Sequence, residues 1–151
     1  VKYLEREFES LPELDEIRVG VMDGLTYAQV KEKHPQEFSQ RQANKLTYRY
    51  PSGESYVDLL SRVLPLFGKL PTTDGPLLVV AHQAVLRCFY GIMTNATWEE
   101  LPFLNIAQHT VIEVKLSEDG RDLVETRYKI SENGTETTVS AQRKAPVLLR
   151  D

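Results

Sequence analysis

Residues 76–90 read Pro76-Leu77-Leu78-Val79-Val80-Ala81-His82-Gln83-Ala84-Val85-Leu86-Arg87-Cys88-Phe89-Tyr90. The first six form an apolar run without polar alternation, which predicts a strand buried on both faces of a parallel sheet. A helix-like pattern follows His82 without a long loop. Open α/β sheets bind ligands at the carboxyl ends of their strands, and a helix amino terminus attracts anions. The stretch therefore predicts an α/β fold with an anion site at His82, and phosphate is the ligand that we expect.

Composition and charge narrow the class of protein. The 151 residues suffice for one domain, and a hydrophobic fraction of 41% is that of an ordinary globular chain. A net charge of −4 argues against nucleic acid as a partner, and no apolar run approaches the roughly 18–20 residues that span a membrane. The single cysteine, Cys88, cannot form an internal disulfide, so we expect a cytoplasmic protein. The three histidines show no metal-ligand spacing, and no metal or other cofactor is expected.

Local signals place the other elements. Thr26 and Gln29 match a capping box, which predicts a short helix that ends before Pro35, and a second helix is expected over 36–44. The clearest helix is predicted over 55–70. Its expected core-facing residues have helical spacing: Tyr56, Leu59, Leu60, Val63, Leu64 and Phe67. Alternating apolar residues on both sides of the turn at 118–120 predict a hairpin over 112–130.

Three side chains of the opening stretch could bind an anion. His82 would stand at the end of the strand with Gln83 beside it, and Arg87 lies about one helical turn beyond Gln83. A lone histidine is more often a hydrogen-bonded core residue. The position of His82 between a strand and a helix, together with these neighbours, favours a role in the site.

Glu16 is a second candidate, within the sequence Leu14-Asp15-Glu16-Ile17. Taken alone, such a residue is more often a surface carboxylate. It becomes functional if the fold brings it to His82, where a carboxylic acid could act as a general acid.

A basic group with tyrosines nearby is the third feature. Arg41, Lys45 and Arg49 are spaced four apart, which is usually a solvated helix face. The rings around Arg49 weaken that interpretation, because arginine forks and a lysine point charge suit a phosphorylated sugar. Tyr27 and Tyr56 could donate hydroxyl hydrogen bonds to the same ligand, or could belong to the core.

These motifs, in this order, resemble the bisphosphatase domain of the 6-phosphofructo-2-kinase/fructose-2,6-bisphosphatases. The resemblance covers roughly residues 13–130 and is carried by two strings, Tyr48-Arg49-Tyr50-Pro51-Ser52-Gly53-Glu54-Ser55-Tyr56 and His82-Gln83-Ala84-Val85-Leu86-Arg87. That domain belongs to the histidine phosphatase, or phosphoglycerate mutase-like, superfamily. The resemblance implies a three-layer α/β sandwich with a mainly parallel central sheet, represented here without its first strand. Residues 1–131 would be the C-terminal part of this domain and residues 132–151, which are polar and weakly patterned, a tail.

The resemblance also implies roles for the candidate residues. Glu16 matches the proton donor of the family, and His82 matches its second active-site histidine. The residues implied to hold the fructose phosphate are Tyr27, Arg41, Lys45, Tyr56, Gln83 and Arg87, with Arg49 as a nearby basic position. The implied reaction is hydrolysis of fructose 2,6-bisphosphate to fructose 6-phosphate and phosphate through a phosphohistidine, without a metal.

One part of the family pattern is absent from these residues. The nucleophilic histidine of the family lies in an Arg-His-Gly segment, whereas His34 follows Lys33, His82 follows Ala81 and His109 follows Gln108. We expect the nucleophile upstream of residue 1 and expect this chain alone to be inactive. A phosphate loop of the kinase type is also absent, so the kinase that the resemblance implies is expected in an N-terminal domain of a longer protein. Such a protein could form a homodimer.

Two other functions stay open at this point. The chain could belong to a related sugar-phosphate phosphatase or mutase with another substrate. It could also be a non-catalytic regulatory module that binds a sugar phosphate without turning it over. The basic residues and tyrosines favour the sugar bisphosphate over other phosphorylated substrates.

Overall fold

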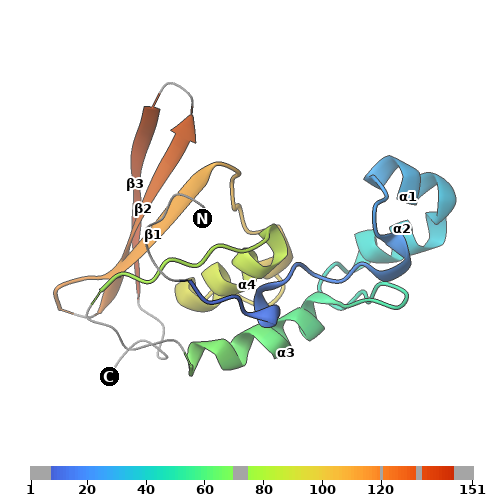
Figure 1. Ribbon diagram of the computed structural model, residues 1–151, viewed down its shortest axis with the longest axis horizontal. Coiled ribbons are helices and arrows are strands. Elements are labelled where there is room, and N and C mark those ends of the chain that lie inside the picture. Colours follow the sequence, from blue (N-terminus) through green and yellow to red (C-terminus); the bar gives the residue numbers. More distant parts are fainter. Residues whose placement is uncertain (1–7, 70–74, 120, 132–133, 145–151) are drawn as a thin grey trace. The chain divides into compact units, whose positions relative to one another are not determined.

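The computed structural model describes residues 8–69, 75–119, 121–131 and 134–144 (Figure 1). The chain divides into two compact units, with the boundary between Val85 and Leu86. Helix α4, Gln83–Thr94, begins in the first unit and continues in the second. No helix in the described ranges is long and apolar enough to cross a membrane.

Helices dominate the first unit. Two 3₁₀ turns, η1 (Pro12–Leu14) and η2 (Gly20–Met22), precede α1 (Tyr27–Lys33) and α2 (Pro35–Ala43), and α3 spans Tyr56–Phe67. The predicted capping box is confirmed, because the Thr26 side chain accepts a hydrogen bond from Gln29 N and the Gln29 side chain accepts one from Thr26 N. Both hydrogen bonds satisfy N–H groups that lack partners at the start of a helix.

Helix α3 supplies much of the core of this unit. Leu59 and Val63 are fully buried, and Tyr56 and Leu66 are nearly so. These residues form one stripe along the helix, as the periodicity predicted for the first three. Leu64 was expected in the core but is 43% exposed, because it lies about 100° around the helix from Val63. Leu66 completes the stripe in its place.

The segment 76–81 differs from its prediction. It is extended but is not a strand, and no described segment pairs with it. Leu77, Leu78 and Val80 are 49%, 58% and 65% exposed. A parallel strand forms only where a neighbour shares its ladder of hydrogen bonds, so an apolar run alone cannot produce one. The buried strand is therefore wrong for the described residues, whereas the helix predicted after His82 is confirmed as α4.

The second unit contains an antiparallel sheet with the order β1-β2-β3 (Figure 1). The strands are β1 (Thr110–Leu116), β2 (Asp122–Ser131) and β3 (Gly134–Lys144). The hairpin of β1 and β2 is confirmed, with Val111 opposite Tyr128. The tail predicted from residue 132 is wrong for residues 134–144, because β3 pairs along the second edge of β2, and its residues 145–151 lie outside the described residues. Threonines and a valine within β3 suit a strand, and the edge of β2 supplies the partner that a polar segment lacks alone.

Two contacts fasten α4 within the second unit. A Cβ added to Gly91 would lie 1.9 Å from Leu101 Cδ2, so only glycine allows the buried Leu101 to approach the helix this closely. The buried hydroxyl of Tyr90 donates to Glu125 Oε2 at 2.5 Å, and Arg127 Nε donates to Glu125 Oε1 at 2.6 Å. The buried carboxylate is therefore paired, as a charge removed from water must be. These contacts connect α4 to η3 (Leu101–Phe103) and to β2.

Candidate active site

Glu16 lies at the amino terminus of α4. Its Oε1 accepts hydrogen bonds from Ile17 N at 2.9 Å and from Ala84 N at 3.3 Å. Ala84 is the second residue of α4, so the carboxylate satisfies one of the N–H groups that a helix start leaves without a partner. His82 immediately precedes this helix and is exposed. The fold thus brings the Glu16 segment to the segment that follows His82, as the sequence analysis required.

Because both N–H groups bind Oε1, the second oxygen of the carboxyl group has a different environment. Among the described residues, none donates a hydrogen bond to Glu16 Oε2. A carboxyl group held through one oxygen can carry its proton on the other. The arrangement fits a proton donor with a fixed orientation.

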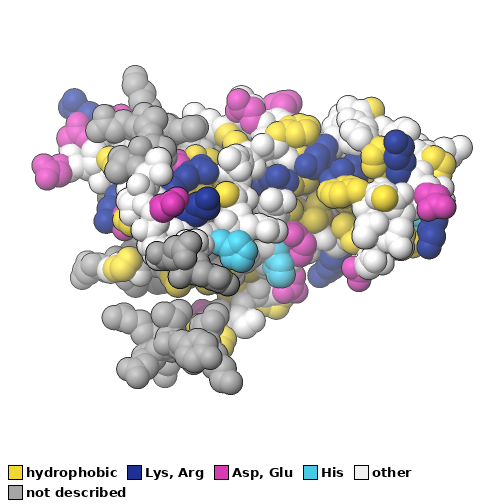
Figure 2. All heavy atoms as spheres, turned by 90° about the horizontal axis from the view of Figure 1, so that it is seen from above, with side chains coloured by type: hydrophobic (Ala, Val, Ile, Leu, Met, Phe, Trp, Pro, Cys, Tyr) yellow, Lys and Arg dark blue, Asp and Glu magenta, His cyan; other side chains and the backbone are white. Residues whose placement is uncertain are grey.

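Arg41, near the end of α2, is held between two tyrosines. Its Nε donates to the Tyr50 hydroxyl at 2.5 Å, and its Nη2 donates to the Tyr27 hydroxyl at 3.1 Å. The guanidinium carbon also lies 5.1 Å from the centre of the Tyr27 ring and 5.8 Å from that of Tyr50, within cation–π range. Tyr27 is exposed, so this arrangement faces solvent. Figure 2 shows dark-blue Lys and Arg side chains beside yellow hydrophobic ones over the part of the molecule that holds α1 and α2.

Tyr50 connects this basic group with Glu16. Burial raises the pKa of the Tyr50 hydroxyl, Arg41 opposes the rise, and the charges of Tyr27 and Glu16 add to it. The hydroxyl therefore remains protonated at neutral pH, where it accepts from Arg41 and can still donate. Glu16 is close enough to Tyr50 for its charge to be felt there.

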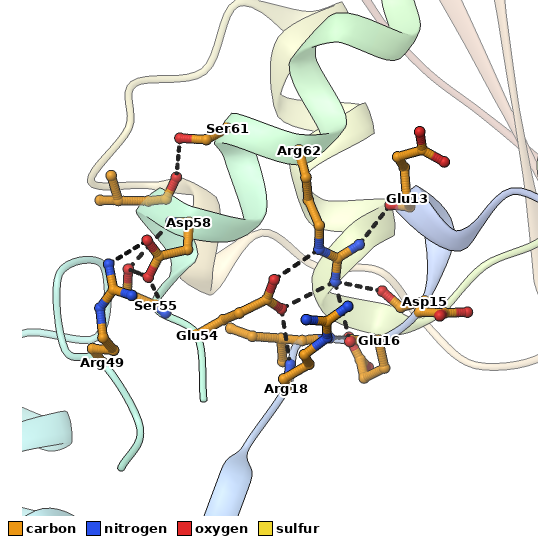
Figure 3. Close-up of polar contacts among 12 residues, drawn as sticks. Glu13, Asp15, Glu16, Arg18, Arg49, Glu54, Ser55, Asp58, Ser61 and Arg62 are labelled. Carbon is orange, nitrogen blue, oxygen red and sulfur yellow. Dashed lines mark hydrogen bonds and ion pairs between the residues drawn. The ribbon is translucent and has the colours of Figure 1, made fainter. Parts of the chain in front are cut away.

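Lys45 and Tyr56 form a second cation–aromatic pair. Lys45 Nζ lies 5.9 Å from the centre of the Tyr56 ring, and Tyr56 is buried at the start of α3. Arg49, in contrast, forms an ion pair with Asp58 in the first turn of α3 (Figure 3). Its guanidinium is already paired with a carboxylate, which makes it a weaker candidate for phosphate than Arg41, which donates to two neutral hydroxyl groups.

Gln83 is the first residue of α4, and Arg87 lies one turn further along the same helix. Arg87 Nε donates to the carbonyl oxygen of Leu104 at 2.9 Å, within the second unit. Arg87 belongs to the second unit, whereas the other predicted site residues belong to the first. Within the first unit, the structure brings Glu16 to the start of α4 and brings Arg41 to Tyr27.

Three residues near the site escaped the sequence analysis: Tyr50, Glu54 and Arg62. The sequence contained a clue to Tyr50, because side chains two residues apart in an extended chain lie on the same side. The rings of Tyr48 and Tyr50 indeed meet edge to face, with their centres 5.1 Å apart. The sequence also contained a clue to Arg62, since Arg62 has the helical spacing from Leu59 and Leu66 that is expected of core-facing residues. A charged residue at such a position needs buried partners.

Within the described ranges, no group of three or more His, Cys, Asp and Glu side chains could hold a metal ion. The chemistry available at the site is that of a carboxyl group, a histidine and several cationic and phenolic side chains. This set can bind a phosphorylated ligand, protonate a departing oxygen and stabilise phosphoryl oxygens.

The chain belongs to the histidine phosphatase superfamily (branch 1), whose family model matches residues 2–129. Similar proteins include an Arabidopsis thaliana 6-phosphofructo-2-kinase/fructose-2,6-bisphosphatase, which is 42% identical over 117 residues. A Saccharomyces cerevisiae fructose-2,6-bisphosphatase is 40% identical over 102 residues. These matches cover 78% and 68% of this chain but only 16% and 22% of the two relatives.

Solved structures confirm the fold. One is an Escherichia coli K-12 protein described as a candidate alpha-ribazole-5'-P phosphatase, with a TM-score of 0.62 and 17% identity. The match covers 96% of this chain and 66% of that one. A second structure, mycobacterial hydrolase 1, has a TM-score of 0.55 and covers 89% of this chain. The predicted phosphoglycerate mutase-like fold class is thus confirmed, although the described residues contain only the antiparallel sheet.

Proposed function

We propose that the protein that contains this chain hydrolyses fructose 2,6-bisphosphate to fructose 6-phosphate and phosphate. The observation that carries the proposal is the contact of Glu16 with Ala84, which brings a carboxyl group to the helix that follows His82. Names of relatives that are about 40% identical support this substrate. The nearby Arg41 and Lys45, with their tyrosines, offer binding for a second phosphate.

The first step transfers the 2-phosphoryl group to a histidine. The nucleophilic nitrogen, which we propose lies upstream of residue 1, forms a P–N bond as the bond between phosphorus and the sugar oxygen breaks. Glu16 gives its proton to that oxygen, so fructose 6-phosphate leaves as an alcohol. His82 would donate to the phosphoryl oxygens and stabilise the charge that develops on them.

The second step releases phosphate. Water attacks phosphorus, the P–N bond breaks, and the Glu16 carboxylate takes a proton from the water. The histidine and Glu16 return to their starting states, and the sum of both steps consumes one water. Such a reaction requires no metal, because the positive charges of the site would neutralise the phosphates.

The other candidate residues would hold the sugar 6-phosphate and orient the substrate. Arg41 is already oriented by the hydroxyls of Tyr27 and Tyr50, and a guanidinium fixed in this way can grip phosphate oxygens with little loss of side-chain freedom. Lys45, Tyr56, Gln83 and Arg87 would contribute further contacts. Arg49 would act through the long-range attraction of its charge.

The wider protein is also part of the proposal. Relatives with double names support a kinase domain elsewhere in the same polypeptide. We propose in addition that the longer protein forms a homodimer. Cys88 is buried and forms no disulfide within the described residues, and we propose on this ground a reducing cytoplasmic location. Mass determination of the native full-length protein and an assay of 6-phosphofructo-2-kinase activity would test these points.

The decisive experiment incubates the full-length protein with fructose 2,6-bisphosphate labelled at the 2-phosphate. We expect equal amounts of fructose 6-phosphate and phosphate, and an acid-labile label on a histidine during turnover. Turnover of a different phosphorylated substrate only would indicate a related phosphatase or mutase. Tight binding without any phosphate release would indicate a non-catalytic module. Either result would refute the proposed function.

A further inference from the structure

Arg62 and Glu54 surround the short segment that carries Glu16 (Figure 3). We propose that this ion pair positions the Glu16 carboxyl group for proton transfer, so that Arg62 and Glu54 are positioning residues of the reaction. The inference rests on the proposed function and adds two residues to the machinery of the site. All the contacts that support it lie within the first unit.

Arg62, on α3, donates to three main-chain carbonyl groups of that segment. Its Nη1 donates to Glu13 O at 2.6 Å, and its Nη2 donates to Asp15 O at 2.7 Å and to Glu16 O at 3.1 Å. The same guanidinium holds Glu54 through Nε at 2.9 Å and Nη2 at 3.1 Å. Every nitrogen of the guanidinium is engaged, and all five donor–acceptor distances lie between 2.6 and 3.1 Å.

Glu54 fastens the other side of the segment. Its Oε2 accepts from Arg18 N at 3.0 Å, and its own main-chain N–H donates to Arg18 O at 2.7 Å. The Arg62 and Glu54 side chains are only 18% and 13% exposed, so water competes little for these contacts. The chain on both sides of Glu16 is thus held by a single pair of side chains.

This support matters because Glu16 lies outside regular secondary structure. Residues 15–19 belong to no helix or strand, so no ladder of hydrogen bonds fixes the backbone there. The carboxyl group reaches Ala84 only while that backbone keeps its position. A shift of about 1 Å at a catalytic group can slow a reaction by a factor on the order of 100. An ammonium group has one nitrogen and cannot span the same carbonyls, so Arg62→Lys should loosen the segment.

The test compares two substrates, only one of which has a leaving group that needs a proton. A positioning role of Arg62 should affect that substrate alone, whereas a loss of stability should affect both. In the full-length protein, phosphoenzyme formation is measured with fructose 2,6-bisphosphate and with 2,4-dinitrophenyl phosphate, whose phenolate leaves without a proton. For Arg62→Lys, we expect a loss of roughly tenfold or more with the sugar and less than about twofold with the aryl ester, because only the sugar needs the general acid. Glu54→Gln should show a smaller loss of the same kind, since its amide oxygen can still accept from Arg18 N.

Two comparisons complete the design. Val63→Ala truncates the buried neighbour of Arg62 without touching the network, so it should destabilise the fold and leave the ratio of the two rates unchanged. In a Glu16→Gln background, Arg62→Lys should cause no further loss, because it acts through Glu16. Equal losses with both substrates, or additive losses in the double variant, would overturn the positioning role while leaving the proposed function intact. If Glu16→Gln itself showed no dependence on the leaving group, the acid role of Glu16 would fail and the positioning role with it.

Discussion

The Oε1 atom of Glu16 lies 3.3 Å from the main-chain nitrogen of Ala84, a residue 68 positions further along the chain. This contact joins two candidate segments that lie far apart in the sequence. It gives α4 a hydrogen-bond acceptor at its start and gives the carboxyl group a fixed direction. The orientation of Glu16 in the candidate site depends on this contact with Ala84.

Replacing Lys45 by Ala should weaken substrate binding much more than it slows turnover. A hydrogen bond to a charged group contributes about 1.5–3 kcal/mol, so KM for fructose 2,6-bisphosphate is expected to rise roughly tenfold to a hundredfold. Steady-state kinetics of the full-length protein measure both parameters. Lys115→Ala is the matched control, because Lys115 forms an exposed ion pair with Glu113 on β1 and is no part of the site. A fall in kcat alone would show that Lys45 does not bind the substrate.

Local signals in the sequence predicted the elements that depend on neighbouring residues. The capping box of Thr26 and Gln29, the apolar stripe of α3 and the hairpin of β1 and β2 each form from contacts within a short stretch. The segment 76–81 could not be predicted in this way, because the pairing of a strand depends on a distant segment and the residues of a strand do not reveal its partner. Strand β3 pairs with the strand that directly precedes it, from Gly134 opposite Ser131 onward, and was missed because its polar composition resembles that of a tail.

The residues of the site also divide into those that the sequence revealed and those that only the folded chain revealed. Glu16 was identified through a family resemblance, and its approach to α4 needed the folded chain. Arg62 was missed because its role lies in contacts with main-chain carbonyls, and a carbonyl group leaves no mark on the sequence. Its place on the apolar face of α3, between Leu59 and Leu66, was the available clue.

Lowering the pH should weaken the contacts by which the Glu54 side chain holds the backbone at Arg18. Burial alone would raise the pKa of Glu54, but hydrogen bonds and charge from Arg62 and Arg18 hold it below the ordinary 4.5. The ionised group therefore contributes stability that is complete above pH 4.5 and is lost as the pH falls through the lower pKa of the folded state. Hydrogen exchange should show that protection of Arg18 N–H declines over that acidic range. Glu54→Gln should remove this pH dependence; an unchanged decline in the variant would assign it to another group.

Replacing Gly91 by Ala should destabilise the second unit. Alanine in a helix usually gains up to about 1 kcal/mol over glycine, but the new Cβ would lie 1.9 Å from Leu101 Cδ2. Overpacking of this kind costs about 1–3 kcal/mol, so the free energy of unfolding in urea should fall. At Gly68, an added Cβ would meet only Pro65 O at 3.7 Å, so Gly68→Ala should be nearly neutral. Equal stability of the two variants would contradict the close packing of Leu101 on α4.

The central claim is that Glu16 protonates the sugar oxygen as the 2-phosphate departs. The most direct test is the rate at which the full-length Glu16→Gln protein releases fructose 6-phosphate from fructose 2,6-bisphosphate. Glutamine keeps the shape and the acceptor for Ala84 N–H but has no proton of suitable acidity to give. We predict that kcat falls by about 100-fold or more while KM changes little. A kcat equal to that of the unaltered protein would contradict the account.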